Sequence, residues 1–151
     1  LDLIALVGRA QEPDGYLDTY FTVKEPDHKW QDLQECHELY CAGHMLEAAV
    51  AWAEATGRTE LLDIMKKNAD LICSLFGKDK RRGYPGHEEI EMALIRLYRL
   101  TGEKKYLETA GYFLEERGTE PSYFKEEAEN RGWTHFGMNP DDREYPQDHA
   151  P

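Results

Sequence analysis

Apolar residues recur at helical spacing in several separate segments of the chain. These segments cover residues 1–10, 32–55, 60–76, 87–100 and 104–117. Apolar positions three, four or seven residues apart share one face of a helix. Glycines at positions 57, 77 and 118 follow three of the segments, as expected for helix ends. The pattern predicts an all-α chain, and 123–130 forms one further short helix.

The segments between these helices differ in character. Residues 16–23 are rich in aromatic and β-branched side chains, but the run is too short and isolated to pair with a second strand. We therefore expect an ordered loop at 16–23. Taken together, the pattern predicts one domain, 1–151, with helical hairpins at about 32–76 and 87–117. A loop-rich segment, 118–151, follows them.

A turn sequence repeats with an offset of 45 residues. Thr56–Leu62 (TGRTELL) recurs as Thr101–Leu107 (TGEKKYL). Helical hairpins that share a turn bury their apolar stripes against neighbouring hairpins, in either an open solenoid or a closed toroid. The offset disfavours a tetratricopeptide array, whose period is about 34 residues.

Charge and cysteine content limit the partners and the compartment. The 151 residues include 30 acidic and 18 basic side chains, for a net charge of -12. Such a surface repels phosphate backbones and anionic lipids, so nucleic acid and membranes are poor partners. The longest apolar stretches are far shorter than the ~20 residues of a membrane span.

The cysteine content bears on the compartment. The chain has three cysteines, which is an odd number, and it shows no apolar leader. Both observations favour reduced thiols and a cytoplasmic setting. Both chain ends have the character of cuts in a longer protein.

Two histidine–glutamate pairs are the main candidates for a binding site. His37-Glu38 and His87-Glu88 lie near the start of the first helix of each hairpin, so they should project at the same end of the fold. Imidazole N–H groups donate to hydroxyls and carboxylates accept from them, which suits a polyhydroxylated sugar. The alternative for both glutamates is helix capping. His37 precedes its Thr-Gly turn by 19 residues and His87 precedes its own by 14, which would place them at different depths.

Three further features have a structural alternative. His37, Cys41 and His44 share a helical face, which allows a metal site, but a packed thiol beside one buried histidine is the preferred interpretation. Cys73 should lie in the core.

Aromatic residues in the connecting segments can stack on a sugar face or simply pack against other side chains: they are Tyr16, Tyr20, Phe21, Trp30, Tyr84 and Trp133. Acidic residues are too abundant for spacing alone to select a glycosidase carboxylate pair.

Three motifs together resemble glycoside hydrolase family 127. They are Asp14–Phe21 (DGYLDTYF), His37–His44 (HELYCAGH) and Pro85–Glu91 (PGHEEIE), and their order and spacing match the family as well. The family's β-L-arabinofuranosidases have a catalytic (α/α)6 barrel, so the resemblance implies that the hairpins belong to an incomplete (α/α)6 toroid.

The resemblance also implies roles for individual residues. His37 and His87 are similar to the family's histidines that hydrogen-bond the arabinofuranose. We assign Tyr16 and Glu88 to the same substrate-binding set, and we assign no catalytic residue to this chain. The expected partners are a carbohydrate and the remainder of the parent chain.

The family's catalytic centre matches nothing in this sequence. In the family, a zinc-bound cysteine is the nucleophile of a retaining hydrolysis and a glutamate is the acid/base. Residues 147–151 resemble the opening of the family's next conserved segment. We therefore expect a fragment of a glycosidase that carries sugar-binding histidines but no metal ligand, with zinc implied for the full-length parent.

Two other functions remain open at this point. An N-acylglucosamine epimerase-like barrel is also built from helical hairpins and also places histidines at its pocket. A non-enzymatic helical-repeat module could bind a basic partner through its acidic face. The toroid is preferred because an open solenoid has no need for histidine and aromatic residues gathered at one helical end.

Overall fold

The computed structural model describes residues 2–130 and 132–133, and in this part of the chain the regular structure is helical. The α-helices are α1 (Asp2–Ala10), α2 (Thr19–Lys24), α3 (Glu38–Thr56), α4 (Glu60–Leu75), α5 (Ile90–Thr101), α6 (Lys104–Arg117) and α7 (Tyr123–Asn130), with a 3-10 turn η1 (Pro26–His28). Within these residues the only β-type pairing is an isolated bridge between Phe76 and Arg81. The expected all-α class is confirmed.

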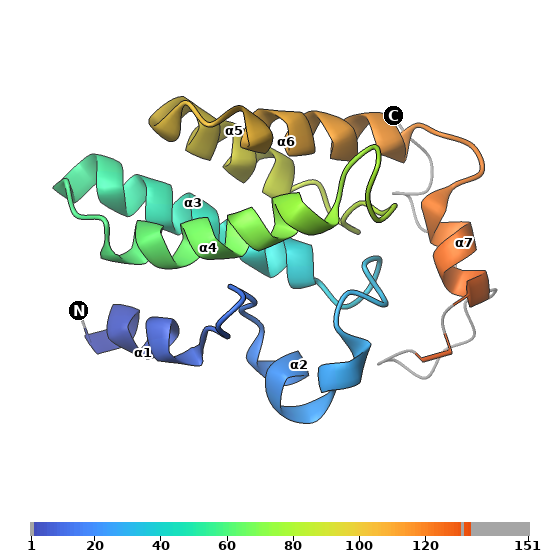
Figure 1. Ribbon diagram of the computed structural model, residues 1–151, viewed down its shortest axis with the longest axis horizontal. Helices are drawn as coiled ribbons and strands as arrows, with labels where there is room; N and C mark the ends of the chain where they lie inside the picture. Colours follow the sequence, from blue (N-terminus) through green and yellow to red (C-terminus); the bar gives the residue numbers. More distant parts are fainter. Residues whose placement is uncertain (1, 131, 134–151) are drawn as a thin grey trace.

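Two antiparallel hairpins, α3/α4 and α5/α6, form the body of the molecule (Figure 1). Helices α3 and α5 pack directly against each other, and each packs against the second helix of its own hairpin. Helix α1 lies along α4, while α7 lies beyond the end of α6. The core between the hairpins consists of fully buried side chains such as Leu46, Val50, Met65, Ile72, Leu94, Leu97 and Phe113.

The repeated Thr-Gly sequence forms the same turn at the end of both hairpins. Gly57 and Gly102 have φ of 70° and 75°, a left-handed conformation that glycine adopts without steric cost. Thr56 Oγ1 donates to the Trp52 carbonyl and accepts from the Arg58 N–H. Thr101 Oγ1 makes the equivalent bonds with Leu97 and Glu103. The sequence repeat is therefore a structural repeat.

The segment 16–23 is not the loop that the sequence predicted. Residues Thr19–Lys24 form α2, because the Asp18 side chain caps this short helix and accepts hydrogen bonds from the Tyr20 and Phe21 N–H groups. Phe21 then buries its ring, with 2% of its surface exposed. The helix cap and this burial outweigh the β-type composition of the segment.

The two central helices begin later than predicted, at Glu38 instead of residue 32 and at Ile90 instead of 87. His37, at the N-cap of α3, has a left-handed backbone with φ 58°, so the chain before it cannot continue the helix. The predicted bounds of 60–76, 104–117 and 123–130 agree with α4, α6 and α7 to within one residue. Most of the segment expected to be loop-rich, including residues 147–151, lies outside the described residues.

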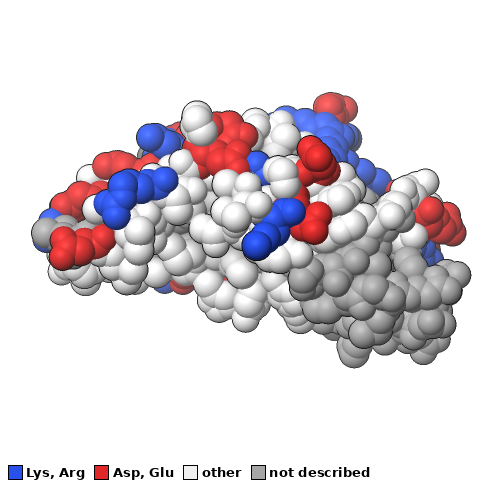
Figure 2. Space-filling view, turned by 90° about the horizontal axis from the view of Figure 1, so that it is seen from below, with Lys and Arg blue, Asp and Glu red and all other residues white. Residues whose placement is uncertain are grey.

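Charges of both signs lie close together on the surface. In the view of Figure 2, acidic and basic side chains neighbour one another and neither sign gathers into an extended patch. Lys or Arg side chains pair with Asp or Glu in many places among the described residues, as Arg96 does with Glu47. None of the described helices has both the length and the apolar character needed to cross a bilayer.

Candidate functional site

His37 and His87 meet at the end of the hairpins where α3 and α5 begin. Their Nε2 atoms lie 3.1 Å apart and their ring centroids 5.0 Å apart. Both residues are half-buried. The unequal distances from the Thr-Gly turns do not separate them, because each histidine lies in the segment before its helix. The two residues predicted to share a site are therefore in contact.

Glycines allow the two histidine-bearing segments to approach each other. The Gly86 N–H donates to the Leu33 carbonyl at 3.1 Å, and a Cβ at Gly86 would lie only 2.0 Å from the Gln34 carbonyl oxygen. Within α3, a Cβ at Gly43 would lie 2.9 Å from the Ile90 backbone at the start of α5. Any side chain at either position would push the two segments apart.

Tyr40 and His44 extend the site along α3. The Tyr40 ring contacts both histidines edge-on, with centroids 5.7 Å from His37 and 5.3 Å from His87. On its other side it contacts His44 at 4.4 Å, and His44 Nδ1 lies 3.3 Å from a carboxylate oxygen of Glu89. Tyr40 was not among the predicted site residues. Its spacing of three residues from His37 is the signal that could have placed it beside the histidine.

Glu38 follows His37 in the sequence, and 3% of its surface is exposed. Its carboxylate accepts from the Tyr16 hydroxyl at 2.5 Å and from the Trp30 N–H at 2.8 Å. Burial raises the pKa of Glu38 to about 7, although both hydrogen bonds act in the opposite direction. Glu38 therefore ties three separate parts of the chain together.

A second buried carboxylate, Glu127 of α7, holds the segment before His37 from the other side. It accepts from the N–H groups of Leu33 and Gln34 at 2.9 and 3.2 Å, and from the Tyr123 hydroxyl at 2.7 Å. Burial raises its pKa to about 7. Helix α7 thus holds the segment that precedes His37.

Arg117, the last residue of α6, holds the segment that carries His87. Its Nη2 donates to the Pro85 carbonyl at 2.5 Å and its guanidinium lies 4.8 Å from the centre of the Tyr84 ring. The Arg117 Nε also lies 3.2 Å from a carboxylate oxygen of Glu88. Arg117 therefore contacts Tyr84 and Pro85 before His87 and Glu88 directly after it.

Glu91 is a third buried carboxylate, in the first turn of α5. It is 3% exposed, and neither of its oxygens has a hydrogen-bond partner among the described residues. Burial raises its pKa to about 7, while the charge of Arg117 lowers it. A buried carboxylate without donors is costly in its charged form, so Glu91 favours the protonated state more than an exposed glutamate does.

The other two predicted site residues, Tyr16 and Glu88, differ in exposure. Tyr16 is 1% exposed and its ring packs edge-on against Trp30, 5.1 Å between centroids. The Glu88 side chain is 47% exposed beside Arg117. Glu38 lies in the first turn of α3, as the capping alternative expects, whereas Glu88 lies before the N-cap residue of α5, Glu89.

Most of the aromatic candidates are packed in the core, and the cysteines differ in exposure. Cys73 is buried, as expected, but Cys41 is exposed, so the prediction of a packed thiol at Cys41 was wrong. All three cysteines are free thiols. Four of the six aromatic candidates are buried in the core: they are Tyr16, Phe21, Trp30 and Tyr84. Among the described residues, no group of three or more His, Cys, Asp or Glu is arranged to hold a metal ion.

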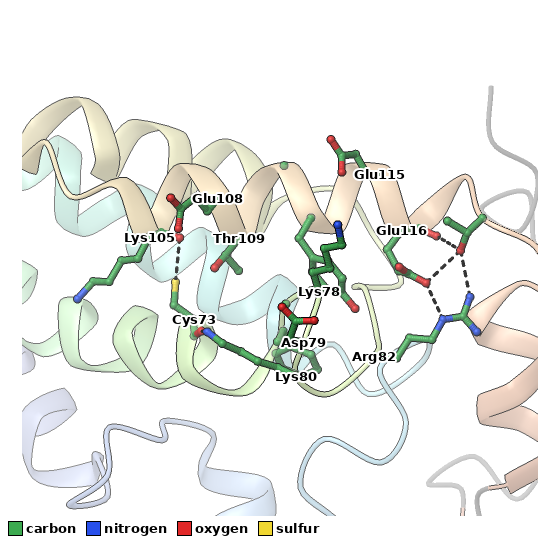
Figure 3. A pocket seen from close by; sticks show the side chains of 15 residues that line it. Cys73, Lys78, Asp79, Lys80, Arg82, Lys105, Glu108, Thr109, Glu115 and Glu116 are labelled. Atoms are coloured by element: carbon green, nitrogen blue, oxygen red, sulfur yellow. Dashed lines mark hydrogen bonds and ion pairs between the residues drawn. The ribbon is translucent and has the colours of Figure 1, made fainter.

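A groove of about 780 Å³ lies away from the histidines, between α6 and the segment after α4 (Figure 3). Three of its four basic side chains are engaged: Lys80 donates to the Cys73 carbonyl, and Arg82 pairs with Glu116. Lys105 pairs with Asp70, outside the groove. These contacts leave no cluster of free cations for an anionic ligand there.

Comparisons with known proteins agree on one family. Residues 2–151 match the family model described as beta-L-arabinofuranosidase, GH127 catalytic domain. The non-reducing end beta-L-arabinofuranosidase of Bifidobacterium longum subsp. longum is 42% identical over an alignment of 129 residues, and the match covers 80% of this chain and 19% of that protein.

Two solved structures are similar to this chain. One is a GH127 beta-L-arabinofuranosidase from Geobacillus stearothermophilus T6, with a TM-score of 0.84 and 54% identity, over 88% of this chain and 21% of that one. The other is a GH127 beta-arabinofuranosidase, with a TM-score of 0.73 and 42% identity, over 78% and 20% of the two chains. The chain thus spans about one fifth of the length of these relatives.

Proposed function

Because the chain belongs to glycoside hydrolase family 127, we propose that it forms the sugar-holding part of a glycosidase that acts on terminal β-L-arabinofuranosides. The family match favours this function over an epimerase-like barrel and over a helical-repeat interaction module. It also agrees with the expected fold class, helical hairpins of an (α/α)6 toroid. The parent enzyme is then a retaining hydrolase, as the family resemblance implies.

The observation that carries the proposal is the contact between His37 and His87. A hydrogen bond between two neutral imidazole Nε2 atoms requires one to donate and the other to accept. A sugar hydroxyl both donates and accepts, so it can replace this one bond with a bond to each ring as the rings move apart. Because the two rings already lie side by side, only a small side-chain movement is needed when the sugar binds.

Glu88 and Tyr16 complete the proposed substrate-binding set in different ways. The half-exposed Glu88 carboxylate is able to accept from a sugar hydroxyl while Arg117 holds it in place. Tyr16 presents almost no surface, and its hydroxyl is bound to Glu38. A direct contact between Tyr16 and the sugar therefore stays a prediction.

The bond-breaking groups are proposed to come from other parts of the parent protein. The family resemblance implies a zinc-bound thiolate and an acid/base glutamate, and zinc would supply a deprotonated, nucleophilic sulfur. The described residues of this chain do not fit a zinc site. Their proposed work is to bind the sugar and orient it.

We also propose a reducing, cytoplasmic compartment. This rests on the free thiols, of which Cys41 is exposed to solvent. Carbohydrate is the proposed partner, together with the remainder of the parent chain.

The test is hydrolysis of p-nitrophenyl β-L-arabinofuranoside by the full-length protein. His37→Ala and His87→Ala should each raise KM by about tenfold or more, because each removes a hydrogen bond to the bound sugar. His28→Ala is the matched control: His28 stacks on Trp133 and pairs with Glu25, neither of which belongs to the proposed substrate-binding set, so KM should not change. An unchanged KM in both site variants would overturn the proposal.

A second experiment tests the 151-residue chain alone, which should release no p-nitrophenol. If this chain did turn over the substrate, and a zinc chelator abolished that turnover, the bond-breaking groups could not all lie in other parts of the protein.

A further inference from the structure

The backbone of His37 has an unusual conformation that the histidine itself does not hold in place. His37 has φ 58° and ψ 15°, a left-handed conformation that a residue with a Cβ adopts at an energetic cost. Its side chain makes no capping bond to α3. Such a conformation persists only when the neighbouring structure fixes it, so the direction of the imidazole depends on what surrounds residue 37.

Glu38 is the group that fixes it. The residue follows His37 directly, and its carboxylate reaches back to the N–H of Trp30, the other non-glycine residue with a left-handed backbone (φ 64°) among the described residues. The Tyr16 hydroxyl donates to the same carboxylate at 2.5 Å. Rotation of the peptide between residues 37 and 38 would move this buried carboxylate off both donors.

We propose that Glu38, held by the Tyr16 hydroxyl and the Trp30 N–H, is a positioning residue that aims the His37 imidazole at the sugar. The proposal rests on the sugar-binding role proposed for His37. Glu38 is too deeply buried to reach a ligand, with 3% of its surface exposed, and it acts through its neighbour. The Tyr16 hydroxyl then contributes to binding by locking Glu38.

A matched pair of tyrosines separates positioning from general stability. The Tyr16 and Tyr106 hydroxyls each donate to a carboxylate at 2.5 Å, and the two residues are 1% and 0% exposed. Tyr106, in α6, binds Asp70 of α4, and no recorded contact joins either residue to the histidines. In the full-length protein, Tyr16→Phe should raise KM for p-nitrophenyl β-L-arabinofuranoside by about fivefold with little change in kcat. Tyr106→Phe should lower the unfolding temperature and leave KM unchanged. Equal effects of the two variants on KM would overturn the proposal.

A double-mutant cycle tests whether Glu38 acts through His37. Glu38→Gln keeps the size of the side chain but cannot accept from both donors in the same way. It should raise KM by about tenfold in the natural protein and by less than about twofold in a His37→Ala background, because the side chain that it aims is then absent. The same factor in both backgrounds would overturn the proposal, even with His37 still needed for binding. A His37→Ala protein with unchanged KM would instead overturn the sugar-binding role of His37, and this inference with it.

Discussion

The Nε2 atoms of His37 and His87 lie 3.1 Å apart, although 50 residues separate them in the sequence. Two glycines account for this proximity. Gly86 brings the segment before His87 onto the backbone of Gln34, and Gly43 brings α3 onto the start of α5. Side chains at these two positions would separate the segments that carry the imidazoles.

Gly86→Ala should therefore destabilise the protein strongly. The new Cβ would lie 2.0 Å from a backbone oxygen, which cannot move aside as a flexible side chain would. We expect a loss of about 2–4 kcal/mol in the free energy of unfolding, measured by urea denaturation. Gly111→Ala is the control: a Cβ there meets nothing within 4 Å in the middle of α6, so it should stabilise the protein by about 0.5–1 kcal/mol.

Glu127→Leu should also be costly, since it removes the acceptor of the Leu33 and Gln34 N–H groups. A buried donor left without a partner costs about 1–3 kcal/mol, so thermal unfolding should shift down by several degrees. The exposed Glu129, two residues further along α7, serves for comparison through Glu129→Leu. Similar unfolding temperatures for the two variants would contradict the role assigned to Glu127.

The pKa values of Glu38, Glu91 and Glu127, each raised to about 7, predict how stability depends on pH. Between pH 4.5 and 7 the folded state binds more protons than the unfolded state, so the free energy of unfolding should fall as pH rises through this window. Each unit of difference between the folded and unfolded pKa of one group changes the free energy of unfolding by at most about 1.4 kcal/mol across this window.

Glu91→Gln isolates one of these groups. The variant cannot ionise, so it should be more stable than the natural protein at pH 8 and nearly equal to it at pH 4.5. Circular dichroism melting curves at intervals between these pH values would measure the difference. Glu108→Gln, on the exposed face of α6, should leave the slope unchanged, and an equal slope for Glu91→Gln would exclude Glu91 as a source of the pH dependence.

The two Thr-Gly turns should respond alike to substitution. Gly57→Ala and Gly102→Ala each place a Cβ on a left-handed residue with no steric obstacle nearby, so each should cost about 1 kcal/mol from backbone strain alone. Urea denaturation of the two variants gives the comparison. A difference of more than about 1 kcal/mol would mean that the turns are not structurally equivalent.

The sequence was sufficient for the parts of the fold that depend on local patterns. The helices α4, α6 and α7 and both closing turns follow from apolar period and glycine position, and the shared end of the two histidines follows from their place at the helix starts. Their direct contact depends on the close approaches at Gly43 and Gly86, and the unequal spacing from the turns had indicated different depths. The fold class and the family were expected and are confirmed.

The remaining features depend on contacts between distant residues. The late start of α3 depends on the left-handed backbone of His37, which no local pattern signals. The burial of Glu38 depends on donors at Tyr16 and Trp30, eight or more residues away, and a glutamate in a first turn is equally typical of helix capping. Tyr40 was not predicted as a site residue because its spacing fits an apolar stripe as well as it fits a position beside His37. Helix α2 was missed because a single cap, Asp18, determines it.

The two closing turns lie at the opposite end of the hairpins from the histidines. Helix α3 alone has 19 residues and spans roughly 28 Å at ~1.5 Å per residue. A fluorophore or a spin label attached at exposed Arg58, just after the first turn, would therefore be far from any bound sugar. That end of the molecule offers an attachment point for following the protein spectroscopically while its substrate end is left undisturbed.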